Sequence, residues 1–186
     1  MVRIETIKTP LAGVLTVRRQ RIEDERGFLS RLYSAEEFAA VGANKPIAQI
    51  NHTKTRLRGT VRGMHFQRPP YAEVKLVTCL RGQVFDVALD LRRASPTYLQ
   101  WHAELLTETN DHSLLIPEGV AHGFQALTDD CELLYLHTVA YQPDAEGAVN
   151  AGDPRVAINW PLAIACMSER DRRHPLLTDG FEGLRL

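Results

Sequence analysis

His65 lies in a segment whose residue types could carry acid–base chemistry. The stretch Arg62–Gln67 reads RGMHFQ, so an imidazole at the end of a strand stands between a guanidinium and an amide, just after a glycine-punctuated loop. Imidazole titrates near neutral pH and can take a proton from a substrate there. Taken alone, the stretch is compatible either with a general base beside an anion site or with a surface or loop histidine whose hydrogen bonds are already made.

Three other side chains could act with it. Lys75 interrupts the otherwise apolar strand 74–81. On an inward face a lysine must be desolvated, so it pairs with an anion or meets a developing oxyanion, whereas on an outward face it is merely solvated. Tyr135 either packs in the core or offers its hydroxyl to a cavity. His122 begins another strand after a turn that contains proline and glycine.

Motifs for metals and nucleotide cofactors are missing. A two-histidine metal site needs two His separated by one residue, a Glu shortly after and a third His on a later strand. His65 is followed by Phe66 and Gln67, without the second His. The sequence also lacks G-x-G-x-x-G, the P-loop and the G-x-S-x-G elbow. We therefore expect no metal and no cofactor.

The elements that must position these residues are short strands. In Gln83–Asp90 the residues Phe85, Val87 and Leu89 face one way and the even-numbered residues the other, which predicts a half-buried strand. Many short strands indicate a sandwich or closed barrel. The other predicted strands are 13–22, 27–33, 46–52, 74–81, 100–107, 112–116, 122–127 and 131–140.

Helices are predicted to be accessory. Ser34 is followed three residues later by Glu37, the spacing of a capping box. Ser168–Asp171 is expected to open a short turn near the end of the chain. The fold class predicted from the elements together is all-β.

Length and composition predict one domain. The 186 residues are 44% apolar, enough for one core, and show no repeat or linker, so we expect a single domain over residues 1–186. The cysteines at 79, 131 and 166 are too widely spaced for a disulfide framework or a zinc knuckle. We expect them to be reduced and mostly buried, with Cys79 as a packing residue.

Charge and hydropathy exclude two classes of partner. Lys and Arg number 22 and Asp and Glu 23, which gives a formal net charge of −1 and no field to hold nucleic acid. The first residues alternate polar and apolar, and no uncharged apolar stretch approaches the roughly 20 residues of a membrane helix. We expect a cytoplasmic protein without a membrane partner.

Several motifs in order resemble those of the dTDP-4-dehydrorhamnose 3,5-epimerase family, over roughly residues 10–177. The resemblance implies a cupin jelly-roll β-barrel that works as a homodimer in deoxysugar biosynthesis, without metal or nicotinamide. The matching segments are DERGFL (24–29), Gln49 with Asn51, RGTVRGMHFQRPP (58–70), KLV (75–77), RGQVFDVALDLRRASPT (81–97), IPEGVAHGF (116–124), LLY (133–135), INWP (158–161) and SERD (168–171).

The resemblance also implies catalytic roles. His65 matches the family's general base, and Asp171 matches the aspartate that orients its imidazole. Lys75 matches the lysine that stabilises the enolate, and Tyr135 matches the general acid. These roles suit removal of a proton next to a ketone, because the charge that develops on oxygen can be held by a nearby ammonium.

A wider set of residues is implied to bind a nucleotide-diphosphate sugar. The positions that match those holding the diphosphate and sugar are Arg26, Arg62, His122, Glu146 and Arg170. Gln49 and Asn51 match nucleotide contacts, Tyr141 matches the aromatic residue that stacks on the base, and Gln67 is a further candidate. Two departures from the family pattern fall near the base-binding end: Leu29 with Arg31, and a loop between Asn51 and Arg62 that is one residue longer. The segment 147–153 also departs from the pattern, and together these changes leave the nucleotide base open.

The function expected is epimerisation at C3, C5 or both of a nucleotide-linked 4-keto-6-deoxyhexose. Retention of both His65 and Tyr135 favours this reaction, because an acid and a base on opposite faces can invert a carbon. Alternatives are a monofunctional 3- or 5-epimerase, a ketoisomerase acting on another nucleotide sugar, or a non-catalytic cupin that binds sugar nucleotides.

Overall fold

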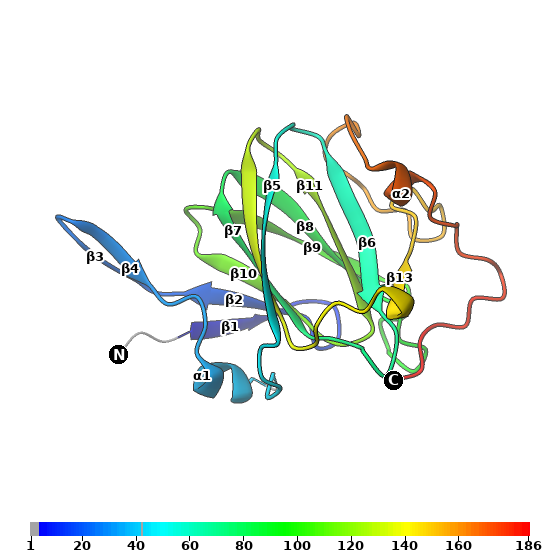
Figure 1. Cartoon of the computed structure of the whole chain (residues 1–186), viewed down its shortest axis with the longest axis horizontal. Coiled ribbons are helices and arrows are strands. Elements are labelled where there is room, and N and C mark those ends of the chain that lie inside the picture. The colour runs from blue at the N-terminus through cyan, green and yellow to red at the C-terminus, as the bar shows by residue number, and fades with distance from the viewer. Residues whose placement is uncertain (1–3, 42) are drawn as a thin grey trace.

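Two antiparallel sheets face each other in a computed structural model that describes residues 4–41 and 43–186 (Figure 1). The larger sheet runs in the order β1 (Ile4–Lys8), β2 (Leu15–Arg19), β10 (His112–Ile116), β7 (Lys75–Arg81), β12 (Cys131–His137) and β5 (Gln49–Thr55). The smaller sheet runs in the order β13 (Glu146–Ala148), β6 (Val61–Gln67), β11 (Val120–Ala126), β8 (Gln83–Asp90) and β9 (Trp101–Thr107). The all-β jelly-roll fold expected from the sequence is confirmed.

A separate hairpin projects from this body. It consists of β3 (Arg21–Asp24) and β4 (Gly27–Ser30), paired only with each other, and Figure 1 shows it extending away from both sheets. The predicted strand 13–22 is wrong as a single element, because the strand is interrupted at Gln20, between β2 and β3.

The main core lies between the two sheets. Val77, Leu114 and Leu133 from the larger sheet meet Leu106 and Phe124 from the smaller one, and each of these is at most 2% exposed. Burial of side chains this large stabilises the fold by roughly 1.5–3 kcal/mol each. One end of the sandwich is thus filled with apolar side chains, which leaves the other end for polar ones.

Strand β8 is buried on both faces, so the half-buried prediction for it is wrong. Its even-numbered residues, such as Val84 and Ala88, face the main core. Its outer face belongs to a second apolar cluster, against which Trp160 and Phe181 from the C-terminal segment pack. Trp160 and Phe181 come from a segment far along the chain from β8, where strand periodicity cannot detect them.

The short helices differ in their caps. Ser34 precedes α1 (Ala35–Ala39) but its side chain makes no capping hydrogen bond, so the predicted capping box does not form. Ser168 does cap α2 (Glu169–Arg172), since its hydroxyl accepts a hydrogen bond from the backbone N–H of Asp171 at 3.0 Å. A 3-10 turn, η1, spans Pro143–Ala145. No helix in the described ranges is long and apolar enough to cross a membrane.

The cysteines agree with the prediction in part. Cys79 and Cys131 are buried in the main core, as expected for packing residues, and both are free thiols. Cys166 is also free but exposed.

Strand β6 contains a bulge that the sequence patterns did not predict. Opposite β11, His122 pairs with His65 and Phe124 pairs with Arg62, so Gly63 and Met64 together face the single residue Gly123. The φ angle of Gly63 is +125°, a conformation that side chains rarely adopt. A Cβ on Gly63 would lie 2.5 Å from the Cα of Gly123, so both strands require glycine here.

Gly63→Ala is expected to lower the free energy of unfolding by at least about 2 kcal/mol, because it combines a disfavoured φ with contact against backbone. Urea unfolding followed by circular dichroism measures this. Gly152→Ala is the control: Gly152 is exposed with a Cβ position 3.4 Å from its nearest neighbour, and its effect should stay within about 0.5 kcal/mol. Equal stability of the two variants would contradict the argument.

Candidate active site

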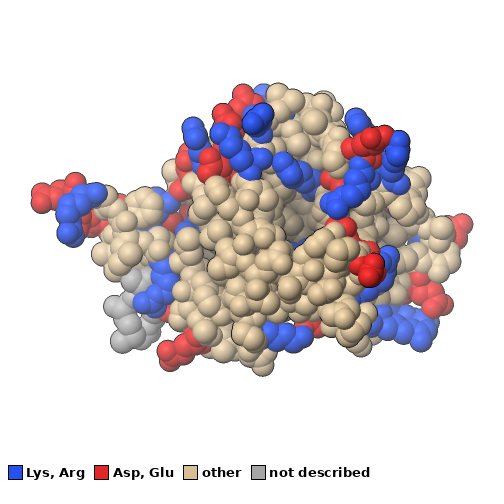
Figure 2. Space-filling model, viewed as in Figure 1, with Lys and Arg blue, Asp and Glu red and all other residues tan. Residues whose placement is uncertain are grey.

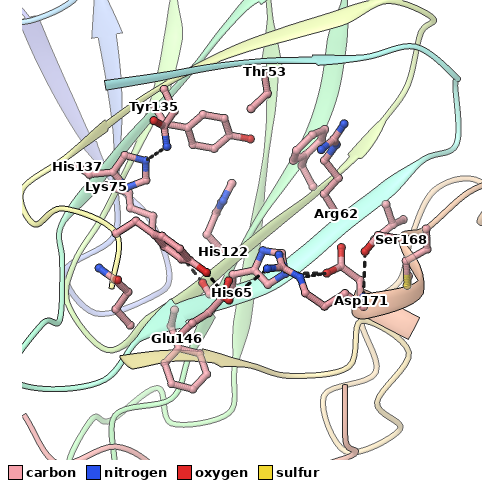
Figure 3. A pocket seen from close by; sticks show the side chains of 18 of the residues that line it. Thr53, Arg62, His65, Lys75, His122, Tyr135, His137, Glu146, Ser168 and Asp171 are labelled. Atoms are coloured by element: carbon pink, nitrogen blue, oxygen red, sulfur yellow. Dashed lines mark hydrogen bonds and ion pairs between the residues drawn. The ribbon is translucent and has the colours of Figure 1, made fainter. Parts of the chain in front are cut away.

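A cavity of about 690 Å³ opens at the polar end of the sandwich. Its lining comes from both sheets and from the segment 166–171, and Figure 3 shows His65, Lys75, His122 and Tyr135 pointing into it. Figure 2 shows Lys and Arg side chains, interspersed with Asp and Glu, along the upper part of the face where the surface is hollowed. The cavity therefore combines a polar interior with a charged rim, which suits a small polar ligand.

The bulge in β6 sets which side chains enter the cavity. In a regular strand, residues three positions apart face opposite sides of the sheet. The extra residue at Gly63–Met64 shifts the alternation by one position, so that Arg62 and His65 lie on the same side of the sheet and both line the cavity. Met64 and Phe66 belong to the outer apolar cluster. Bulges commonly redirect a side chain in this way beside functional sites.

His65 is paired with Asp171. Its Nε2 lies 2.9 Å from Oδ1 of Asp171, which is 3% exposed and held by the one-turn helix α2 (Figure 3). Burial of this carboxyl would raise its pKa, but the hydrogen bond and charge of His65 and the N–H of Gly63 outweigh burial and lower the pKa to about 2. The carboxylate is therefore ionised at neutral pH and can accept the proton of Nε2.

This pairing selects one form of the imidazole. With its proton held on Nε2, His65 carries its lone pair on Nδ1, which has no hydrogen-bond partner among the described residues. The side chain is 25% exposed and lines the cavity. His65 thus has the geometry of a base whose orientation is fixed by a carboxylate.

Tyr135 enters the cavity from the facing sheet. It belongs to β12, is 9% exposed, and its ring meets His122 edge-on with centroids 5.8 Å apart. Burial, followed by the charge of Asp86, raises the pKa of Tyr135 well above its ordinary value. The hydroxyl therefore stays protonated at neutral pH and can act only as a proton donor or hydrogen-bonding group.

Lys75 points inward and is paired, which decides between the two interpretations of its position. Its Nζ lies 3.2 Å from Oε1 of Glu73 and 3.4 Å from the carbonyl oxygen of His65. Burial would raise the pKa of Glu73, but its hydrogen bond to His137 at 2.8 Å and the charge of Lys75 lower it. An ionised Glu73 thus holds Lys75 in a cavity where the lysine is only 7% exposed.

A second histidine–aspartate pair lies deeper in the cavity. Nε2 of His122 is 2.8 Å from Oδ1 of Asp86, which is fully buried on β8. The other carboxylate oxygen, Oδ2, has no hydrogen-bond partner among the described residues. This pair fixes the orientation of the imidazole against which Tyr135 packs.

Most of the remaining predicted residues lie in or near the cavity. Asn51, Gln67, Tyr141, Glu146 and Arg170 line the cavity. At the rim, Oε2 of Glu146 accepts hydrogen bonds from the Tyr141 hydroxyl at 2.9 Å and from Arg170 at 3.2 Å. Gln49 lies behind the rim, where its side-chain oxygen accepts the backbone N–H of Tyr141.

Arg26 lies outside the cavity of its own chain. It sits at the tip of the β3–β4 hairpin, where its 85% exposed side chain pairs with Asp24. A ligand contact from Arg26 is therefore not made within one chain in this structure.

The pairing of His65 with Asp171 was expected from the resemblance, but sequence reasoning missed the partners of Lys75 and His122. Asp86, Glu73 and His137 carry the hydrogen bonds described above, and Thr53 and Ser168 also line the cavity. A signal for Glu73 was available, because it stands two positions before Lys75, just ahead of β7, and residues two apart in an extended chain point to the same side. No local signal could have shown His174, whose ring packs edge-on against His65 with centroids 5.6 Å apart.

Comparison with known proteins gives a consistent result. The family model described as dTDP-4-dehydrorhamnose 3,5-epimerase matches residues 8–179. The dTDP-4-dehydrorhamnose 3,5-epimerase of Salmonella typhimurium is 40% identical over 173 residues, which cover 92% of this chain and 94% of the relative. A dTDP-4-dehydrorhamnose 3-epimerase of Streptomyces niveus is 38% identical over 170 residues, covering 91% of this chain and 82% of that protein.

Solved structures agree with the sequence comparisons. The dTDP-6-deoxy-D-glucose-3,5-epimerase of Legionella pneumophila, in complex with dTDP-4-keto-L-rhamnose, superposes with a TM-score of 0.92 at 32% identity, covering 99% of each chain. The shared fold therefore extends over nearly the whole chain.

The low pKa of Asp171 predicts a pH-dependent contribution to stability. A carboxyl whose folded pKa of about 2 lies below the ordinary value of 3.8 stabilises the fold above pH 3.8, and this contribution is lost as pH falls through about 2. Asp171→Asn should therefore cost about 2 kcal/mol at pH 7, with the deficit shrinking between pH 4 and pH 2. Urea unfolding of both proteins across this range measures it. A deficit that stays constant with pH would contradict the pairing.

Proposed function

Because the chain belongs to the dTDP-4-dehydrorhamnose 3,5-epimerase family and is an isomerase of that kind, we propose that it epimerises a nucleotide-linked 4-keto-6-deoxyhexose next to the ketone. The observation that carries the proposal is the placement of an acid and a base on facing sheets of one cavity. The Asp171-bound imidazole of His65 comes from β6, and the protonated phenol of Tyr135 comes from β12.

The proposed reaction begins with proton removal by Nδ1 of His65. Asp171 stabilises the imidazolium that forms, because its ionised carboxylate already accepts the proton on Nε2. Loss of the proton places negative charge on the ketone oxygen as an enolate. Lys75, oriented by Glu73 and buried in the cavity, can donate a hydrogen bond to this oxygen.

Tyr135 then returns a proton to the carbon from the opposite side. The phenol keeps its proton at neutral pH because burial raises its pKa, so it can deliver that proton only to a strongly basic centre such as the enolate carbon. Inversion follows because the proton leaves toward one sheet and arrives from the other. His65 and Tyr135 exchange these protons with solvent before the next turnover.

The rim supports recognition of a nucleoside diphosphate. Arg62 and Arg170 line the cavity and offer guanidinium groups to phosphate oxygens, and Tyr141 presents a 49% exposed ring on which a base can stack. The Legionella pneumophila relative was solved with dTDP-4-keto-L-rhamnose. We propose a dTDP-sugar of the same class as the substrate of this chain.

A homodimer would complete this site. The projecting hairpin exposes Ile22, Phe28 and Leu29, each at least 50% exposed, and such a patch on a two-stranded element suits burial against a second chain. Arg26 at the hairpin tip would then reach the cavity of the partner. This arrangement would explain how Arg26, which was predicted to bind substrate, can do so although it lies outside its own cavity.

Inversion of one carbon instead of two is the second candidate. It is favoured by one observation, the 38% identity to the Streptomyces niveus 3-epimerase, which is close to the 40% identity to the Salmonella typhimurium 3,5-epimerase. The number of carbons inverted depends on how far the sugar ring can turn in the cavity between the two events.

His65→Ala should lose deuterium exchange at every carbon where wild type exchanges, by on the order of 10²- to 10⁴-fold, because the general base is removed. The measurement is NMR of dTDP-4-keto-6-deoxyglucose incubated with enzyme in deuterated water. Wild type should exchange deuterium into C3, C5 or both, which also identifies the carbons inverted. His112→Ala is the control, since that histidine pairs with Glu104 outside the cavity and should leave exchange unchanged. Near-wild-type uptake in His65→Ala would refute the role.

Tyr135→Phe should separate exchange from inversion. Without the phenol, the enolate still forms, but its proton returns mainly from His65 on the original face, so deuterium enters with little inverted product. If Tyr135 were only a packing residue, the variant would lose one hydrogen bond, about 0.5–1.5 kcal/mol of stability, and keep its epimerisation rate. An exchange-to-inversion ratio equal to that of wild type would remove the proposed acid.

A further inference from the structure

A third side chain joins the pair formed by His65 and Asp171. His174, two residues beyond the end of α2, places Nε2 3.4 Å from Oδ1 of Asp171, the same oxygen that binds His65. One nitrogen from each histidine and one oxygen of the carboxylate all lie within 4.8 Å of one another. The three residues come from positions 65, 171 and 174, so no short motif in the sequence contains them.

The nitrogen of His174 is unusual because it lacks a partner. Nε2 is buried yet makes no hydrogen bond within the described ranges, since its contact with Asp171 is an ion-pair distance and not a hydrogen bond. A buried polar atom without a partner costs free energy unless something else satisfies it. Nε2 of His174 lies 3.4 Å from Oδ1 of Asp171, so a group that binds this nitrogen from that side would also contact the carboxylate.

The donor set suits a transition metal ion. Two imidazole nitrogens and one carboxylate oxygen, with an open position, form the ligand set of many zinc sites. Bonds of about 2.0–2.1 Å from a tetrahedral ion place neighbouring ligand atoms about 3.3 Å apart. The separations of 2.9 and 3.4 Å between Asp171 and the two histidines are close to this spacing, so small side-chain rotations would complete the site.

Access and charge also bear on the site. His65 and Asp171 line the cavity, which leaves a path from solvent and room for a fourth ligand such as water. The opposing group is Arg170, whose guanidinium lies 3.5 Å from Nε2 of His65 and 3.7 Å from Asp171. Its side chain is 57% exposed and is also paired with Glu146, so it can move toward the rim when a cation enters.

We propose that His65, Asp171 and His174 bind a divalent transition metal ion such as Zn²⁺, and that the bound ion inhibits the enzyme. The metal binding stands on the geometry alone, whereas the inhibition rests on the proposed role of His65 as the base. The ion is thus a regulator or inhibitor of the reaction and not its cofactor.

Inhibition follows from the chemistry of the imidazole. To coordinate through Nε2, a neutral His65 must carry its lone pair on that nitrogen, so its single proton moves to Nδ1. Nδ1 is the atom that would take the substrate proton, and in this form it has no lone pair to do so. The ion also occupies Asp171, which can no longer stabilise an imidazolium. Proton abstraction therefore stops while the ion is bound.

Cobalt binding tests the site without reference to activity. Chelator-treated wild type is titrated with CoCl₂ while visible absorption bands of coordinated Co²⁺ are recorded, and ZnCl₂ is then added to displace the cobalt. We expect one ion per chain. The affinity of His174→Gln and His174→Phe should fall at least as much as the roughly 10- to 100-fold that loss of an outer-shell partner costs. Gln retains a polar group beside Asp171, and Phe retains a ring against His65.

The matched control is His52→Gln, which removes a histidine that also pairs with a carboxylate, that of Glu132, but whose carboxylate contacts no second histidine among the described residues. It should bind cobalt as wild type does. Equal cobalt binding by wild type and both His174 variants, or no binding by wild type, would overturn the site. If the chain turned over none of the sugars tested, the cobalt result would still decide the question of binding.

Inhibition is tested with deuterium exchange. Zn²⁺ should block exchange in wild type, added chelator should restore it, and the His174 variants should remain active at the Zn²⁺ concentration that stops wild type. Binding of Zn²⁺ without loss of exchange would overturn the inhibitory half of the proposal.

Discussion

The close approach of β6 and β11 at Gly63 and Gly123 is the constraint on which the site depends. A side chain at either position would collide with backbone, and the bulge at this contact places both Arg62 and His65 in the cavity lining. Once His65 is so placed, the one-turn helix α2 can present Asp171 to it at 2.9 Å. A local backbone feature of the smaller sheet therefore decides which side chains can take part in chemistry.

Three buried carboxylates organise the cavity, and each forms a hydrogen bond or ion pair with at least one basic side chain. Asp171 holds His65, Asp86 holds His122, and Glu73 holds both Lys75 and His137. A buried carboxylate is costly unless it is paired, so these interactions constrain the orientations of the three histidines and of Lys75. The phenol of Tyr135, by contrast, is kept neutral by burial, so donors and acceptors of protons are separated between the two sheets.

Sequence patterns identified single site residues more successfully than the side chains that contact them. The strands β7 and β9 to β12 were recognisable from local periodicity, and His65, Lys75 and Tyr135 from motifs that resemble one family. His65 was placed at the end of a strand, but the bounds of β6 were not predicted, because its bulge and polar residues interrupt the alternation on which such predictions depend. Burial of the outer face of β8 and the packing of His174 against His65 depend on contacts with distant residues of the chain, which no local pattern contains.

The central claim is that acid and base lie on opposite sides of the reacting carbon. A crystal structure of the His65→Asn variant with a bound dTDP-4-keto-6-deoxy sugar tests it most directly, because the substrate should accumulate without turnover. We expect the carbon next to the ketone within about 3.5 Å of the position-65 side chain on one face, with the Tyr135 hydroxyl on the opposite face and Lys75 beside the ketone oxygen. A sugar bound with both side chains on the same face, or with its ketone away from Lys75, would contradict the account.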